Sequence, residues 1–82
     1  MKQENYNLAV KNFSQSLTLN KTRNFPGGVA DQYTNLAIAY EKQQNYQKAC
    51  VNLRKARIIY HKNYQDKQAD NIAKRLDALD CI

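Results

Sequence analysis

The stretch YTNLAIAYEKQQNYQKACVNLRKA, residues 33–56, decides the fold, because its apolar side chains recur at intervals of three and four residues. This spacing places them on one face of an α-helix. The polar segment KQQN, residues 42–45, divides the stretch into two such helices and is short enough to force them antiparallel. The apolar positions are Tyr33, Leu36, Ala37 and Tyr40, followed by Tyr46, Ala49, Cys50, Leu53 and Ala56.

The same spacing continues on both sides of this stretch. It runs through Tyr6, Ala9, Val10, Phe13 and Leu17 before it, and through Ala69, Ile72, Ala73, Leu76 and Leu79 after it. We therefore predict an all-α fold with helices near residues 3–20, 30–43, 46–63 and 67–80. The segment NFPGGVA, residues 24–30, holds the chain's only proline and both of its glycines. We expect it to be the turn between the first two helices, with the glycines supplying positive φ.

Length and composition limit the class of protein. The chain has 82 residues, which is enough for one small domain, and a formal net charge of +6. No apolar run is long enough to span a bilayer, and the first ten residues lack the apolar core of a signal peptide. We therefore expect a cytoplasmic location, where Cys50 and Cys81 would stay reduced thiols. Two cysteines at this separation fit no zinc pattern.

An internal repeat relates the two halves of the chain. Sliding the sequence against itself by 40 residues aligns bulky residues with bulky ones and small residues with small ones. The aligned pairs include Tyr6 with Tyr46, Ala9 with Ala49, Phe13 with Leu53, Ser16 with Ala56, and Leu36 with Leu76. Such agreement is typical of a repeated helix-packing unit, because small side chains let neighbouring helices approach where large ones would hold them apart.

The full unit at residues 30–63 resembles a tetratricopeptide repeat. Tyr33, Leu36, Ala37 and Tyr40 match the first helix of that pattern, with Tyr33 in place of the usual Trp and Ala37 in place of the usual Gly. Ala49, Leu53 and Ala56 match the second helix, and His61 stands where the closing Pro would be. The 40-residue unit is similar to the longer variety found in kinesin light chains.

The resemblance implies an α-solenoid of antiparallel helix hairpins, formed by residues 1–82 as a single domain. Residues 3–20 would be the second helix of a truncated repeat, residues 30–63 a full repeat, and residues 67–80 a final helix. The chain would then be a piece of a longer array. A generic four-helix bundle is the alternative, since the apolar spacing alone would suffice for it.

The sequence contains no arrangement of residues that indicates catalysis. The only histidine, His61, has no acid within four residues, and PGG lacks the spacing of a phosphate-binding loop. Asp66, Asp70, Asp77 and Asp80 follow helical intervals, which are better explained by a solvated helix face than by a metal site. We therefore expect a non-enzymatic protein with no cofactor and no bound metal.

All charged residues of the third helix are basic. No acid occurs between Lys42 and Gln65, and the segment contains a basic strip made up of Lys48, Arg54, Lys55, Arg57 and Lys62. Such a strip can meet nucleic acid or another polyanion, or it can keep a helical array soluble; solubility is the more common role of surface charge. A basic module binding polyanions through residues 42–65 is thus the alternative function, with nucleic acid an unlikely partner.

The resemblance to tetratricopeptide repeats implies a protein–protein interaction scaffold that binds a peptide or partner helix in a groove lined by first-type helices. Asn35 precedes Leu36, and Arg75 precedes Leu76 forty residues later, with Lys74 beside it. In the family, an Asn and basic residues at these places grip acidic peptides, so Asn35, Lys74 and Arg75 are the predicted peptide-binding residues. The first helix lacks a hairpin partner, so we also expect a homodimer, domain-swapped pair or larger assembly through that helix.

Overall fold

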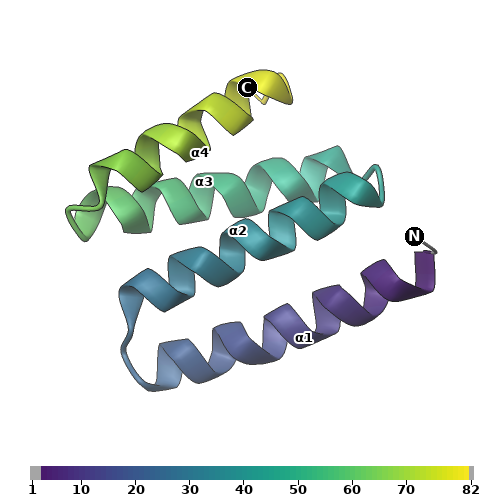
Figure 1. Cartoon of the computed structure of the whole chain (residues 1–82), viewed down its shortest axis with the longest axis horizontal. Helices are drawn as coiled ribbons and strands as arrows, with labels where there is room; N and C mark the ends of the chain where they lie inside the picture. The colour runs from purple at the N-terminus through teal and green to yellow at the C-terminus, as the bar shows by residue number, and fades with distance from the viewer. Residues whose placement is uncertain (1–2, 82) are drawn as a thin grey trace.

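Four α-helices joined by tight turns make up the computed structural model, which describes residues 3–81 (Figure 1). They are α1 (Gln3–Thr22), α2 (Pro26–Lys42), α3 (Tyr46–Lys62) and α4 (Asp66–Ala78). Each helix packs mainly against its neighbour in the chain, and residues 3–81 contain no strand. The predicted all-α class with four helices is confirmed. Residues 1–2 and 82 of the predicted domain lie outside the described part of the chain.

The helices end in one repeated way. Asn24, Gln44, Tyr64 and Asp80 each have φ between 54° and 62°, and the residue after each donates its N–H to a carbonyl five residues back. This is the Schellman motif, which satisfies carbonyls that the helix end leaves without partners. The first three turn residues are 20 apart, so one helix and its turn occupy 20 residues and two occupy the 40 found in the sequence.

The start of α2 differs from the prediction. The helix begins at Pro26, not near residue 30, because proline's fixed φ suits a first helical turn and its missing N–H is not needed there. Neither glycine has positive φ, so the expected role of PGG was wrong. Close packing explains the glycine at position 28, because an added Cβ would lie 2.7 Å from Cδ2 of Phe25 and 3.0 Å from Nδ2 of Asn20.

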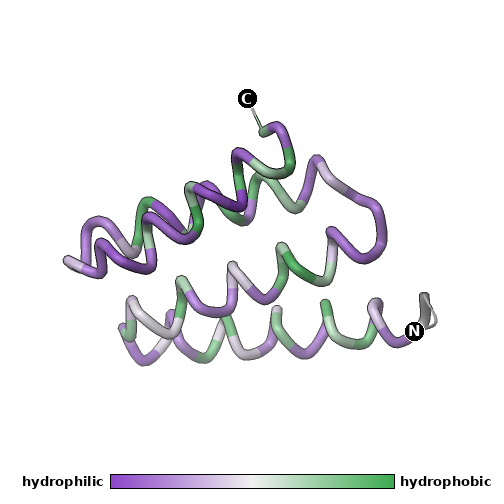
Figure 2. The backbone as a smooth tube through the Cα atoms, turned by 45° about the horizontal axis from the view of Figure 1, so that its top comes forward, coloured by the Kyte–Doolittle hydropathy of each residue, from purple (hydrophilic) through white to green (hydrophobic). Residues whose placement is uncertain are grey.

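The core lies where α2, α3 and α4 meet. Leu53 is the largest fully buried side chain, and Ala30, Ala49 and Ala56 beside it are fully covered. Alanines let the helices approach closely, as the alternation of small and bulky residues predicts. The predicted contact between α2 and α3 is therefore confirmed, with Tyr40 half-buried at its edge. Apolar residues recur along each helix between polar ones (Figure 2).

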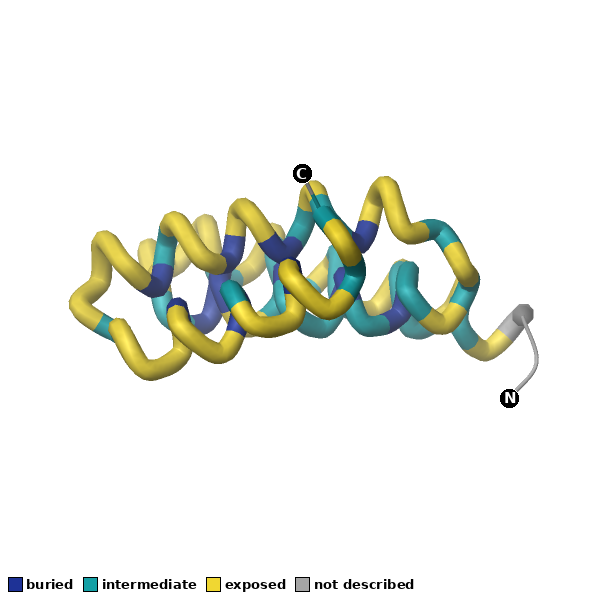
Figure 3. The backbone as a smooth tube through the Cα atoms, turned by 90° about the horizontal axis from the view of Figure 1, so that it is seen from above, coloured by how far each residue is buried: buried dark blue, intermediate teal, exposed yellow. Residues whose placement is uncertain are grey.

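The first helix is covered on one side only. Val10, Phe13 and Leu17 pack against the core, yet no residue of α1 from 5 to 22 is buried (Figure 3). Lys21 of α1 and Lys55 of α3 both place their Nζ over the ring of Tyr33, at 5.4 and 5.5 Å from its centroid. Both helices therefore contribute a cation to the same ring of α2, and Figure 1 shows α2 lying between them.

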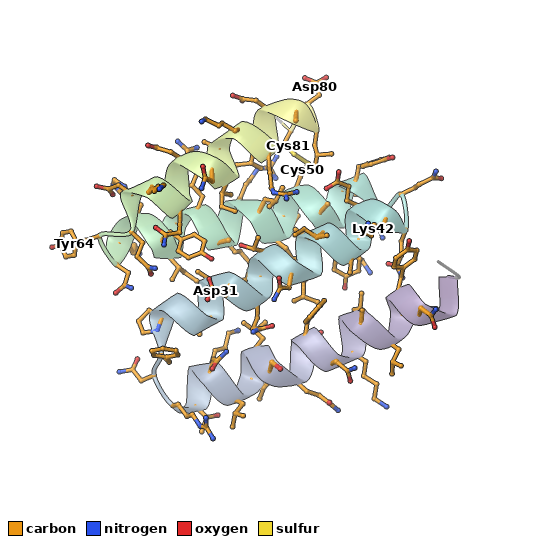
Figure 4. The ribbon with its side chains drawn as sticks, viewed as in Figure 1. Asp31, Lys42, Cys50, Tyr64, Asp80 and Cys81 are labelled. Atoms are coloured by element: carbon orange, nitrogen blue, oxygen red, sulfur yellow. A yellow bond between two sulfur atoms is a disulfide. The ribbon has the colours of Figure 1, made fainter. Side chains whose placement is uncertain are left out.

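A disulfide joins Cys50 of α3 to Cys81, just beyond α4, with the Cα atoms 5.8 Å apart (Figure 4). The prediction of reduced thiols is therefore wrong, while the cytoplasmic location stays a prediction. The chain runs from Cys50 to the end of α3, turns, and returns along α4, so two antiparallel helical segments of similar length bring the cysteines together. Disulfides are typical of oxidising environments.

Candidate functional site

A groove between α1 and α2 adjoins Asn35, one of the predicted peptide-binding residues. Its volume is about 200 Å³, and we call it the α1/α2 groove. It is lined by Tyr6, Ala9 and Phe13 of α1 and by Asn35, Ile38, Ala39 and Lys42 of α2. The lining is mostly apolar and includes one cation and no acid, so the groove suits an apolar helix face or peptide side chain with an acidic neighbour.

The internal repeat indicates why this groove is open. Ala9 and Phe13 are the counterparts of Ala49 and Leu53 forty residues later. Ala49 and Leu53 are 0% and 1% exposed in the core that α3 shares with α2, whereas Ala9 and Phe13 are only half-buried. Among the described residues, no helix lies on α1 in the way that α2 lies on α3. The groove is thus an open position for a helix, and α2 occupies the equivalent position on α3.

The predicted peptide-binding residues occupy different surroundings. Asn35 lies in the α1/α2 groove, where its Nδ2 donates to Oε1 of Gln32 at 3.4 Å. Arg75 of α4 places its Nη1 3.8 Å from Oε2 of Glu41 on α2, so its charge already has a carboxylate neighbour. Lys74 is exposed. The structure therefore brings Asn35 to a groove but joins it to neither Lys74 nor Arg75 through a described contact.

The residues of the predicted basic strip have three different surroundings on α3. Lys48 places its Nζ 5.4 Å from the centroid of the Tyr40 ring, and Lys55 does the same at Tyr33, so both cover tyrosines of α2. A cation over an aromatic face is attracted by the ring's quadrupole. Near the end of α3, Arg57 and Lys62 line a hollow of about 400 Å³ that also includes Asp70 of α4. Arg54 lines a third hollow beside the disulfide.

Charge is separated between the helices. No acid occurs from residue 5 to residue 30 or from residue 42 to residue 65, so α3 and nearly all of α1 carry cations only. The acids of residues 5–81 lie on α2, on α4 and just beyond α4. The surfaces formed by α1 and α3 therefore carry an excess of positive charge.

Tyr60 supplies a polar link inside the core. Its hydroxyl donates to Oδ1 of Asp31, joining α3 to α2. Burial raises the pKa of Tyr60 to about 12, and the hydrogen bond to Asp31 adds to that effect. The phenol therefore stays protonated over the physiological range, which is consistent with a structural role.

The sequence predicted an uncovered apolar face on the first helix and a binding role for Asn35, but it did not show that the two form one groove. Tyr6, Phe13 and Ile38 follow the ordinary spacing of core residues, and nothing local distinguishes them from buried positions. The available signal was the repeat: α1 aligns with α3, whose apolar face α2 covers, so α1 carries a second face of the same kind.

Residues 3–81 contain no group of three or more His, Cys, Asp or Glu residues able to hold a metal ion. Over the same residues, no helix combines the length and apolar composition that crossing a bilayer requires. Comparison with known proteins found no matching family model, no matching curated protein and no matching solved structure.

Proposed function

We propose that this chain is a non-catalytic protein-interaction module of tetratricopeptide type, which docks an amphipathic helix of a partner protein in the α1/α2 groove. The observation that carries the proposal is the contrast between Ala9 and Phe13, which are half-buried, and their repeat counterparts Ala49 and Leu53, which α2 helps to cover. A site that accepts a helix in one repeat has the shape to accept one in the other.

The chemistry of the groove supports this kind of partner. Ala9 and Ala39 leave room for a helix backbone to approach, while Phe13 and Ile38 offer apolar surface to its side chains. Asn35 can donate and accept a hydrogen bond at the same time, which suits a polar residue of the incoming helix. Lys42 at the same site, together with the net charge of +6, favours a partner with acids beside its apolar face.

The helix that fills the equivalent position provides a probe. A synthetic peptide of residues 26–42 carries the face with which α2 packs on α3, so we expect it to bind the α1/α2 groove. Ile38→Glu in the protein should weaken binding about tenfold or more, because it places a charge in an apolar contact. Fluorescence anisotropy of the labelled peptide measures this change.

Ile58→Glu is the matched control, since Ile58 is 54% exposed on α3 and lies outside the groove. It should bind the peptide as the parent does, and a scrambled peptide should not bind either protein. Equal affinity of the parent and Ile38→Glu, or no binding at all, would contradict the proposal.

The polyanion alternative stays a prediction, favoured by the absence of acids from α3 and nearly all of α1. Binding of a polynucleotide through residues 42–65 would weaken steeply as salt rises, because each neutralised phosphate releases counterions. Docking of the peptide in an apolar groove would weaken only gently. A salt titration of the two ligands therefore separates these functions.

A further inference from the structure

Two of the interhelical turns lie together at one end of the molecule. The α1–α2 turn, residues 23–25, and the α3–α4 turn, residues 63–65, both lie on the left in Figure 1, opposite the two chain ends. They are close in space: a Cβ added to Gly27 would lie 3.2 Å from Oε1 of Gln65 and 3.9 Å from Nδ2 of Asn63. This arrangement brings the two turns together at one end of the molecule.

Each of these turns presents an aromatic ring to solvent. Phe25 is 61% exposed and Tyr64 is 91% exposed, and Figure 4 shows the Tyr64 ring projecting beyond the helices. Tyr64 has φ of 59°, a conformation that glycine or asparagine adopts at much lower cost than a bulky residue. A solvent-exposed tyrosine in a strained turn is unfavourable for folding alone, so a role for its ring in binding would explain it.

Cations lie close in sequence to the two rings. Arg23 and Lys62 are exposed, and so is Lys21, whose Nζ lies 5.4 Å from the centroid of the Tyr33 ring. With Phe25 and Tyr64 they form what we call the aromatic end. The nearby acid Asp66 has its Oδ1 3.6 Å from Nδ1 of His61. The aromatic end therefore carries exposed apolar surface, and its three cations outnumber the single negative charge of Asp66.

Two mostly apolar hollows lie beside Pro26 and Ile59 at this end of the molecule. One, of about 240 Å³, is lined by Lys21, Asn24, Phe25, Pro26, Val29 and Ile59. A second, of about 200 Å³, is lined by Pro26, Ile59, Lys62 and Asn63. Each hollow has an apolar floor and a lysine in its wall, so each matches a molecule with an anionic group next to a hydrocarbon chain.

We propose that the aromatic end binds the surface of an anionic phospholipid bilayer. Phe25 and Tyr64 enter the interface between headgroups and acyl chains, where aromatic side chains are favoured. Arg23 and Lys62 lie at the level of the phosphates and are attracted by the negative surface potential. Apart from Phe25, the apolar residues that line the hollows are aliphatic and offer a nucleic-acid base nothing to stack on, which favours lipid over nucleic acid.

The test is flotation of the disulfide-bonded protein with vesicles of phosphatidylcholine alone or mixed with phosphatidylserine. We expect binding to the mixed vesicles only, weakening as salt rises. The double variant Phe25→Ser with Tyr64→Asn should lower the partition coefficient about tenfold or more, because two apolar rings leave the interface. Asparagine suits the positive φ at residue 64, so this variant should keep its fold, which circular dichroism verifies.

Arg23→Gln with Lys62→Gln should lower partition about fivefold for each charge removed. The matched control is Lys11→Gln with Lys42→Gln, which removes the same charge from exposed positions away from the aromatic end and should have a smaller effect. The proposal would be overturned by equal partition of the parent and the Phe25→Ser, Tyr64→Asn variant. It would also be overturned by binding to a polynucleotide without binding to phosphatidylserine vesicles.

Discussion

Breaking the bond between Cys50 and Cys81 should destabilise the chain substantially. The disulfide closes a segment of 31 residues that includes most of α3 and all of α4. In the chain-entropy account, such a cross-link restricts the unfolded chain by about 3.7 kcal/mol at 25 °C. A domain of this size has a free energy of unfolding of about 4–12 kcal/mol, so the bond supplies a large share of it.

We expect reduction to lower the free energy of unfolding by about 2–4 kcal/mol, because measured effects of disulfides fall within or below the entropic figure. The corresponding fall in Tm is about 10–25 °C for a domain of this length. Thermal melting followed by circular dichroism, with and without a thiol reductant, measures it. The loss should begin at α4, since that helix packs mainly on α3 alone, and hydrogen exchange would show its amides exchanging first.

The Cys50→Ser, Cys81→Ser double variant is the control. It should melt near the temperature of the reduced parent and should not respond to reductant. If the parent melts at one temperature in both conditions, the reasoning is refuted, because the bond then either does not form or restricts nothing that matters to stability.

Four further predictions follow from the packing. Ala49→Leu should cost about 1–3 kcal/mol by overpacking a fully buried position, and a melt matching the parent's would contradict the packing between α2 and α3. The pKa of Tyr60 is raised to about 12 in the folded chain, so between pH 10 and 12 only the unfolded phenol ionises. The free energy of unfolding should therefore be constant below pH 10 and fall by about 3 kcal/mol between pH 10 and 12. In denaturant titrations, Tyr60→Phe should abolish that fall. Asn35→Ala should weaken docking of the peptide of residues 26–42 more than Arg75→Ala does, since only Asn35 lies in the groove; calorimetry showing the reverse order would count against the site. Light scattering at rising concentration should detect self-association through the uncovered face of α1, and a monomer up to millimolar concentration would refute it.

The helices and their core could be predicted from the sequence because both depend on local spacing. Ala49, Leu53 and Ala56 are small and bulky in the order that helix packing requires, and all three are buried. The start of α2 was mispredicted because Pro26 is equally at home in a turn and in the first turn of a helix. In the structure Pro26 lies in the first turn of α2, where the N–H of Val29 donates to the carbonyl of Phe25.

Features formed between distant residues were harder to predict. Cys50 and Cys81 meet because α3 and α4 are antiparallel. The thiols were predicted to be reduced because the chain was expected in the cytoplasm, and the antiparallel geometry was not considered. Arg75 looked free for a ligand, but Glu41 approaches it across the contact between α4 and α2. Asn35 was predicted as a binding residue from the family pattern. The apolar groove around it forms only because α1 packs beside α2 while part of its apolar face stays uncovered.

The most direct test of the central claim is a titration of the isotopically labelled chain with the peptide of residues 26–42, followed by amide chemical shifts in NMR. Docking in the α1/α2 groove predicts saturable shifts centred on Ala9, Phe13, Asn35 and Ile38, with little change along the exposed side of α4. Shifts spread over the basic strip of α3 without any in the groove, or no saturable shifts at all, would contradict the claim that this groove is the docking site.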